Sequence, residues 1–210
     1  MKGYHYILIF LLSFNSCQTQ TKDTPPTSKI VGGPCEGCEA IHEYGDKELS
    51  NVDTLPAFNE NKPKIKITGT VFKRDMKTPA ENVILYVYPT NRKGIYETKG
   101  GEKEWARRHG FIRGWIKTGK NGKYTFYTFR PAAYPGGTEP GHIHITVKEP
   151  DKNEYYIDDY FFEDDPLLTA SKRDALQERG GSGIVVPVFE NGIFNTIRDI
   201  YLGKNIPGYE

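Results

Sequence analysis

The chain has 210 residues, and its 28 Lys and Arg residues nearly balance its 27 Asp and Glu residues, so the formal net charge is +1. This balance, without a long run of one sign, indicates that nucleic acid is not a partner. The length leaves room for one domain and a short appendage. Abundant aromatic residues, scarce Met and scattered Gly and Pro favour many short strands joined by turns.

Residues 1–16 are typical of a signal peptide, because Lys2 precedes an apolar run over residues 6–14 that is too short to stay in a bilayer as a helix. Ser16 and Cys17 resemble the end of a bacterial lipobox, in which the Cys receives lipid and becomes the new N-terminus. Phe14 and Asn15 depart from that pattern, and ordinary secretion with cleavage nearby is the alternative. We expect an exported protein, periplasmic or on the cell surface, that is anchored in the membrane by lipid on Cys17.

Two segments separate Cys17 from the predicted sheet. Residues 17–28 are rich in Thr, Pro and Lys and are expected to form a lipidated, solvated linker. Residues 29–63 contain Cys35 and Cys38, which an exported compartment allows to form a disulfide. A zinc site would need further ligands and only His42 is near, while redox catalysis would need a βαβ context that the sequence does not offer.

The pattern changes at residue 64 to alternating polar and apolar residues, and we expect residues 64–210 to form the main domain. About eight strands at short spacing indicate a β-sandwich or barrel. One helix is expected after the last His residues, over residues 166–179. The strands are predicted over residues 64–72, 83–88, 111–117, 124–129, 142–148, 155–162, 184–189 and 194–202.

The clearest local pattern is the segment between two of these strands. Asn121 and Gly122 lie in a polar run between residues 111–117 and 124–129. An Asn-Gly pair of this kind is typical of a tight hairpin turn, so the two strands are expected to pair with each other.

A possible metal site lies on the strand over residues 142–148. His142 and His144 are two residues apart, so both side chains point to the same face and could bind one metal ion. A surface pair or a packed pair is the alternative. The preceding loop, residues 131–141, is rich in Pro and Gly and brings Tyr134 close ahead of the His pair, in an extended conformation set by Pro135.

These residues also form a specific resemblance. Residues 118–126, then 130–135, then 140–144, in that order, are similar to the core of the intradiol ring-cleavage dioxygenases, which include protocatechuate and catechol dioxygenases. Residues 69–79, 83–88 and 94–96 resemble the first strands of the family, and residues 160–167 resemble a strand and an acidic turn behind its site. The resemblance covers residues 64–168, and it implies a β-sandwich.

The resemblance implies an iron site and an activity. The implied ligands of a ferric ion are Tyr96, Tyr134, His142 and His144, and two phenolates are hard anionic donors that suit Fe(III). The implied reaction opens a catechol-like ring between its hydroxyls with dioxygen and gives a muconate-type diacid. Tyr134 would be the axial tyrosinate that the catechol displaces.

Two positions depart from the family pattern. Glu139 stands where the family usually has Arg, and Asp159 stands where it commonly has Gln. Two acids in the pocket would disfavour an anionic intermediate or an anionic catechol, unless Arg113, Arg130 or the pair at residues 107–108 compensates. We place Glu139, Asp159 and Arg113 among the candidate catalytic residues together with Tyr134. The alternative is that the two acids face solvent or pair with a nearby Arg.

Other functions stay open at this point. A non-catalytic binding module, similar to transthyretin-like or carboxypeptidase regulatory-like domains, shares the style of the opening strands over residues 69–88. Such a module needs neither Tyr134 nor the His pair, so the complete set of four favours an enzyme. A third possibility is an iron site with other chemistry, and a homo-oligomer stays open.

Overall fold

The structure is a computed structural model that describes residue 1 and residues 30–210. The predicted signal peptide, the lipid site at Cys17 and the linker over residues 17–28 therefore lie outside the described residues, apart from Met1. None of the helices in the described part is long and apolar enough to span a membrane.

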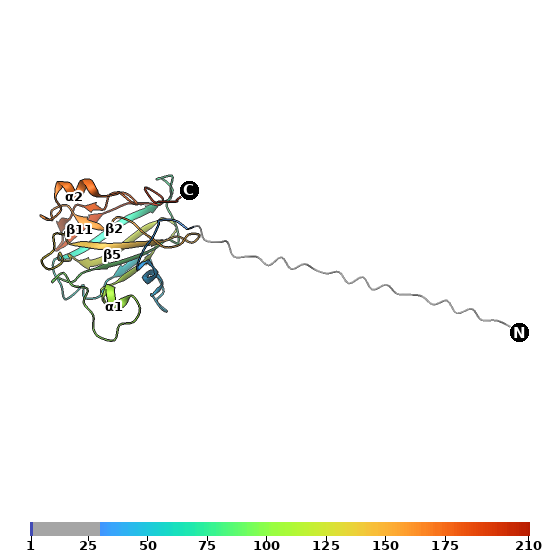
Figure 1. The fold of residues 1–210 in the computed structure, drawn as a ribbon, viewed down its shortest axis with the longest axis horizontal. Helices are drawn as coiled ribbons and strands as arrows, with labels where there is room; N and C mark the ends of the chain where they lie inside the picture. Colours follow the sequence, from blue (N-terminus) through green and yellow to red (C-terminus); the bar gives the residue numbers. More distant parts are fainter. Residues whose placement is uncertain (2–29) are drawn as a thin grey trace.

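The described chain folds as a β-sandwich, as the sequence predicts. Figure 1 shows β11, β2 and β5 side by side in the first sheet. This sheet has the order β1 (Val52–Thr54), β5 (Lys123–Phe129), β2 (Lys64–Phe72), β11 (Ile193–Ile197) and β10 (Val188–Glu190), and β12 (Ile200–Tyr201) also pairs with β2. The second sheet has the order β4 (Gly114–Lys117), β3 (Ile84–Pro89), β6 (His142–Lys148), β8 (Tyr160–Phe162) and β9 (Ile184–Val185), and β7 (Tyr155–Tyr156) also pairs with β6.

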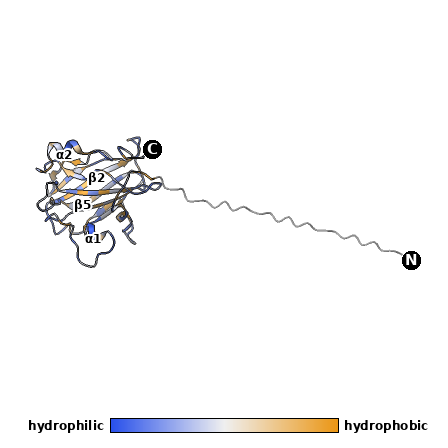
Figure 2. Cartoon of the chain, in the orientation of Figure 1, coloured by the Kyte–Doolittle hydropathy of each residue, from blue (hydrophilic) through white to orange (hydrophobic). Residues whose placement is uncertain are grey.

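The main core lies between the sheets and follows the period of two in each strand. Hydrophobic and hydrophilic residues alternate along β2 and β5 in Figure 2. In the second sheet, alternate residues of β3 and β6 face this core, and they are fully or almost fully buried: Leu85, Val87, Ile143, Ile145 and Val147. The residues between them, including both His residues of β6, therefore lie on the outer face of the second sheet.

A second hydrophobic cluster covers that outer face. Ala40 and Ile41, from the 3₁₀ helix Cys38–His42, pack with Tyr86 of β3 and Trp115 of β4. Cys35 and Cys38 form the predicted disulfide, with their Cα atoms 5.6 Å apart. The part of the N-terminal segment around Ile41 thus forms a layer over the outer face of the second sheet.

The predicted hairpin is wrong. Gly122 does form a tight turn, with φ of 65° and its N–H donating to the carbonyl of Gly119 at 2.9 Å. The strands on either side belong to different sheets, however, because β4 pairs with β3 whereas β5 pairs with β2 and β1. Turn residues determine that the chain reverses, and the long ladder between β5 and β2 determines the partner.

Several predicted elements are shorter in the structure. The predicted strand 155–162 is divided into β7 and β8, and the last two predicted strands are divided into β9, β10, β11 and β12. The helix expected over residues 166–179 is only α2 (Ala170–Ala175), which Thr169 caps by accepting a hydrogen bond from the N–H of Lys172. The short helix α1 (Ala106–His109) and strand β1 were not predicted.

Candidate metal centre

The two His residues of β6 lie on the outer face of the second sheet, with their Nε2 atoms 3.1 Å apart. His142 is buried and His144 is half-buried. Their places follow from the strand itself, since Ile143 and Ile145 face the core and direct the residues between them outward.

Two loops bring tyrosines to this face. Tyr96 follows β3, and Tyr134 lies between β5 and β6. The loops are joined by hydrogen bonds from Thr90 Oγ1 to the carbonyl of Ala132 at 2.7 Å and from the N–H of Ala132 to the carbonyl of Asn91 at 3.2 Å. These bonds hold the two tyrosines on the same side of the sheet.

All four predicted ligands meet at one point. The phenol oxygen of Tyr96 lies 2.5 Å from that of Tyr134 and 2.6 Å from Nε2 of His144. The phenol oxygen of Tyr134 lies 3.3 Å from Nε2 of His142 and 3.4 Å from Nε2 of His144. Two phenol oxygens and two imidazole nitrogens thus form one compact group of possible metal donors.

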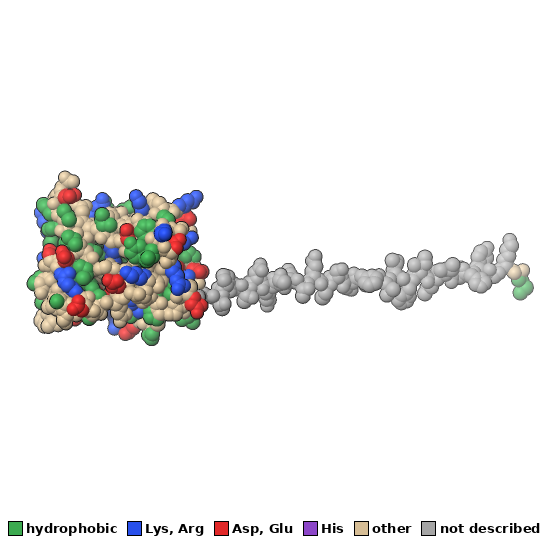
Figure 3. Space-filling model, turned by 90° about the horizontal axis from the view of Figure 1, so that it is seen from above, with side chains coloured by type: hydrophobic (Ala, Val, Ile, Leu, Met, Phe, Trp, Pro, Cys, Tyr) green, Lys and Arg blue, Asp and Glu red, His purple; other side chains and the backbone are tan. Residues whose placement is uncertain are grey.

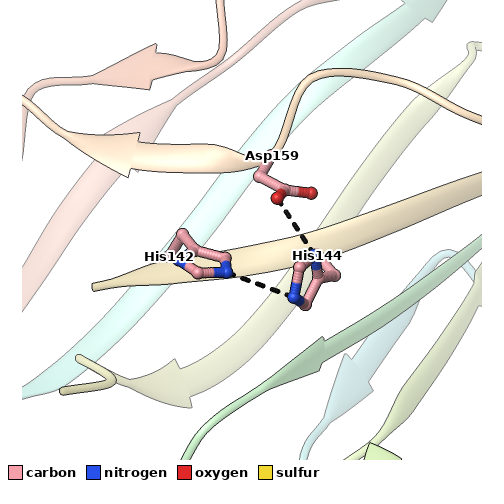
Figure 4. A group of neighbouring side chains, drawn as sticks. All are labelled: His142, His144 and Asp159. Atoms are coloured by element: carbon pink, nitrogen blue, oxygen red, sulfur yellow. Dashed lines mark hydrogen bonds and ion pairs between the residues drawn. The ribbon is translucent and has the colours of Figure 1, made fainter. Parts of the chain in front are cut away.

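Hydrogen bonds on the far side of each ring orient the imidazoles. Nδ1 of His142 donates to the carbonyl of Pro140 at 2.7 Å, and Nδ1 of His144 donates to Oδ2 of Asp159 at 3.0 Å (Figure 4). Since both acceptors require a proton on Nδ1, the lone pair of each ring is at Nε2, on the side of the tyrosines. This arrangement is typical of metal-binding His residues.

His142, His144 and Asp159 could also be regarded as a metal-binding group by themselves, because their donor atoms lie within 4.8 Å of one another. We favour the group of four. Asp159 is bonded to Nδ1 of His144, whereas both tyrosines approach Nε2. A carboxylate in that position orients the ring rather than sharing the metal with it.

The electrostatics of the four donors fit a cation of high charge. Burial raises the pKa of Tyr96 and of Tyr134, and burial lowers the pKa of His142. With no cation the two phenols stay protonated and His142 stays neutral at pH 7. A bound metal ion reverses this preference for the phenols, and two phenolates with two neutral imidazoles are a hard donor set that suits Fe(III).

The structure places two other predicted site residues against different partners. Glu139 has an exposed side chain, and its Oε1 lies 3.7 Å from Nζ of Lys172. Arg113 forms an ion pair of 2.5 Å with Glu43 and lies over the ring of Trp115. Of the candidate catalytic residues, Tyr134 and Asp159 lie at the group of four donors, and Glu139 and Arg113 contact other side chains.

Two of the other arginines proposed to compensate for the two acids are also paired. Arg130 forms an ion pair with Asp164, and Arg108 forms one with Glu36. Arg107 is exposed. The charge of each paired guanidinium is therefore largely balanced by its own carboxylate.

An aromatic stack behind His144 was missed at the level of sequence. Tyr88 is the cross-strand neighbour of His144, and their rings are 4.6 Å apart. His109 also stacks on Tyr88, with the centroids of the two rings 3.9 Å apart. Nδ1 of His109 is 2.9 Å from the hydroxyl of Tyr86. The period of two in β3 already put Tyr86 and Tyr88 on one face, but their contact with His144 depends on the pairing of β3 with β6.

A cavity of about 300 Å³ borders His144. One side is formed by Tyr88, His144, Tyr156 and Asp159 of the second sheet and its connections. The opposite side is formed by residues 34–38, the loop that the disulfide closes. We call residues 34–38 the disulfide loop.

A β-sandwich with this arrangement is the fold of the intradiol dioxygenases. The structure is similar to the dioxygenase domain of a dioxygenase and carbohydrate-binding protein fusion from Streptomyces sp. SirexAA-E, with a TM-score of 0.54, 20% identity and coverage of 84% of this chain and 97% of that chain. It is also similar to 3-chlorocatechol 1,2-dioxygenase from Rhodococcus opacus, with a TM-score of 0.57, 20% identity and coverage of 75% and 67%. At this identity the likeness shows the fold.

The curated homologues of the chain are protocatechuate and catechol dioxygenases. The chain is 29% identical to the beta chain of protocatechuate 3,4-dioxygenase from Burkholderia cepacia over 137 residues, which cover 60% of this chain and 58% of that protein. It is 25% identical to catechol 1,2-dioxygenase 1 from Acinetobacter lwoffii over 210 residues, covering 85% and 64%. The matches thus span less than two thirds of both relatives, and no model of a protein family matches the chain.

Proposed function

We propose that the protein is a ferric-iron-dependent dioxygenase that opens a catechol-like aromatic ring between its two hydroxyls and gives a muconate-type diacid. The observation that carries this proposal is the convergence of Tyr96, Tyr134, His142 and His144, whose phenol oxygens and Nε2 atoms lie 2.5 to 3.4 Å from one another in the contacts described above. The homology to protocatechuate and catechol dioxygenases supports the class of reaction.

The four side chains would hold the iron through two phenolate oxygens and two imidazole nitrogens. When bound, Fe(III) supplies a Lewis acid that orients both oxygens of a catechol and makes the ring reactive toward dioxygen. His142 and His144 are kept in position by Pro140 and Asp159, so the protein contributes a fixed geometry for the donors.

Tyr134 is the side chain that we propose to receive a proton from the substrate, at the phenolate oxygen that it would present when iron is bound. Its side chain is half-buried and belongs to a loop rich in Pro and Gly. Tyr96 lies beside the stacked rings of Tyr88 and His144, which favours a fixed position for it. We therefore assign the proton-accepting role to Tyr134 and a fixed position to Tyr96.

The proposal is tested by metal content and colour. The purified protein loaded with ferric iron should bind one iron per chain and show a visible tyrosinate-to-iron charge-transfer band, and it should take up oxygen with catechol. His144→Ala should lose most of the iron, because water does not replace a lost ligand easily in a set of four.

The matched control is Tyr127→Phe, which removes a phenol from β5 in the other sheet and should leave iron and colour unchanged. A parent protein that stays colourless and free of iron after ferric loading would refute the site. Stoichiometric iron retained in His144→Ala would refute the assignment of that ligand.

A further inference from the structure

The cavity beside His144 suggests which substrates the site accepts. Its volume of about 300 Å³ lies at the lower end of ligand sites, so it suits a single ring with a small substituent. The ring of Tyr88 and the imidazole of His144 form part of one side, and the disulfide loop forms the other. Of the four donors only His144 lines the cavity, so a substituent on a ring held at the donors would reach the space between β6 and the disulfide loop by passing His144.

The disulfide loop is held in place as a defined wall. Cys38 is buried, and its Sγ lies 3.8 Å from Oγ1 of Thr146 on β6. Gly37 has φ of 88°, and a Cβ at this position would lie 3.0 Å from Nε2 of His109 and 3.3 Å from the ring of Trp105. An ion pair between Glu36 and Arg108 connects the loop to α1. The loop thus has contacts with β6 and with the aromatic stack, in addition to its disulfide.

The charged groups that line this cavity are acidic. Asp159 and Glu36 contribute carboxylates, and among the described residues that line the cavity there is no Lys or Arg. In Figure 4 one carboxylate oxygen of Asp159 faces Nδ1 of His144 and the other points away from the ring. Because a metal-bound His144 is neutral, it does not cancel the charge of Asp159.

Glu36 and Asp159 should differ in how much they contribute to the electrostatic potential of the cavity. The side chain of Glu36 is 73% exposed and paired with Arg108, so solvent and its partner screen its charge. The side chain of Asp159 is only 24% exposed. Asp159 therefore dominates the electrostatic potential of the cavity, and Glu36 modifies it at the rim.

Glu139 does not line the cavity beside His144. It lines a different cavity, together with Phe161, Leu168 and Lys172, and its charge is opposed by that lysine. Asp159 is the acid beside the four donors. The second acid that lines the cavity beside His144 is Glu36 of the disulfide loop.

We propose that Asp159 and the disulfide loop form the part of the substrate site that receives the ring substituent, and that they select neutral or cationic catechols over catechols that carry a carboxylate. This inference rests on the proposed function. A carboxylate between these walls would meet a like charge at short range, which at an effective dielectric of about 20 lowers affinity roughly tenfold or more.

The test compares kcat/KM for catechol, protocatechuate and dopamine by oxygen uptake at one pH, with the iron-loaded full chain. The parent should favour catechol and dopamine over protocatechuate by roughly tenfold or more. Asp159→Asn keeps a carbonyl oxygen for the Nδ1–H of His144 but removes the charge. It should lower the ratio of kcat/KM for catechol or dopamine to kcat/KM for protocatechuate. Glu36→Lys reverses a charge without touching His144, and it should narrow the ratio as well. Glu190→Gln, on the outer strand β10, is the matched control and should not change it.

Iron content is measured for each variant, so that a loss of metal in Asp159→Asn is recognised. If that variant loses iron, the ratio measured for Glu36→Lys decides whether the proposal holds. The proposal is overturned if protocatechuate is the best substrate of the parent, or if Glu36→Lys and an iron-replete Asp159→Asn both leave the ratio unchanged. It is also overturned if Glu139→Gln shifts the ratio and these two variants do not.

The failure of the proposed function gives a different result. If the iron-loaded parent takes up no oxygen with any of the three compounds, the proposed reaction is wrong. Titration of the charge-transfer band with each compound then still measures the preference of the cavity, and tighter binding of protocatechuate than of catechol would overturn the inference on its own.

Discussion

At the scale of single residues, burial determines the charge of the rings around the site. His109 is 7% exposed and lies between Tyr88 and Trp105, with Nδ1 bonded to the hydroxyl of Tyr86. Burial lowers the pKa of His109 from its usual 6.5 to about 4. The ring is therefore neutral at pH 7, and it stacks on Tyr88 as an uncharged aromatic group.

This shift predicts a dependence of stability on pH. The folded-state pKa of His109 is below the unfolded value, so the unfolded chain binds more protons between the two values. The contribution of neutral His109 to the free energy of unfolding is complete above pH 6.5 and is lost as the pH falls toward 4. It amounts to on the order of 2 kcal/mol when the partial burial of the ring is taken into account. Urea unfolding of the parent and of His109→Gln across this range measures it. A variant as sensitive to acid as the parent would contradict the expectation.

At the scale of elements, the site depends on the approach of two loops. Gly94, just before Tyr96, has φ of 75°, and a Cβ there would lie 2.0 Å from the carbonyl oxygen of Ala133, next to Tyr134. A glycine is required at this contact, because any side chain would separate the loops or strain the backbone. The distance between the two phenol oxygens therefore depends on a residue that is itself no ligand.

Gly94→Ala should destabilise the fold by about 2 to 4 kcal/mol and lower the affinity for iron, because the backbone has to move to admit the methyl group. Denaturant unfolding and iron titration measure the two effects. Gly119→Ala is the control, since a Cβ at that position meets nothing within 4 Å. Equal stability and equal iron affinity of the two variants would show that the contact is not needed.

At the scale of the whole molecule, the segment before residue 64 completes both the fold and the site. It supplies β1 to the first sheet, the cluster around Ile41 to the outer face of the second, and the disulfide loop to the cavity. Figure 3 shows Lys and Arg interspersed with Asp and Glu on the visible face, without a region of one sign.

The membrane anchor stays a prediction, since Cys17 lies outside the described residues. We propose that the native protein is cleaved before Cys17 and carries lipid on that residue, which would place the domain on a tether outside the cytoplasm. Mass spectrometry of the protein from its native host should show a lipid-modified N-terminal Cys17. An intact N-terminus with an unmodified Cys17 would rule the anchor out, and cleavage elsewhere would favour ordinary secretion.

The sequence by itself determined the fold class, the places of β2, β3, β5 and β6, and the set of Tyr96, Tyr134, His142 and His144 that the structure brings together. Strand periodicity is a local property, so it can be read without knowing which strands pair. The four residues were found through the resemblance of residues 64–168 to the intradiol dioxygenases, which depends on the order of motifs along the chain.

Only the tertiary structure decided the partners of β4 and β5, the layer formed by the N-terminal segment, and the roles of the charged residues near the site. The turn at Gly122 is compatible with a hairpin and with a crossing between sheets, and the choice depends on the packing of residues far apart in the chain. Whether Asp159 or Glu139 lies beside the four donors depends likewise on which side chains the fold places next to each of them. Such long-range contacts are a property of the folded chain as a whole, and no local pattern encodes them.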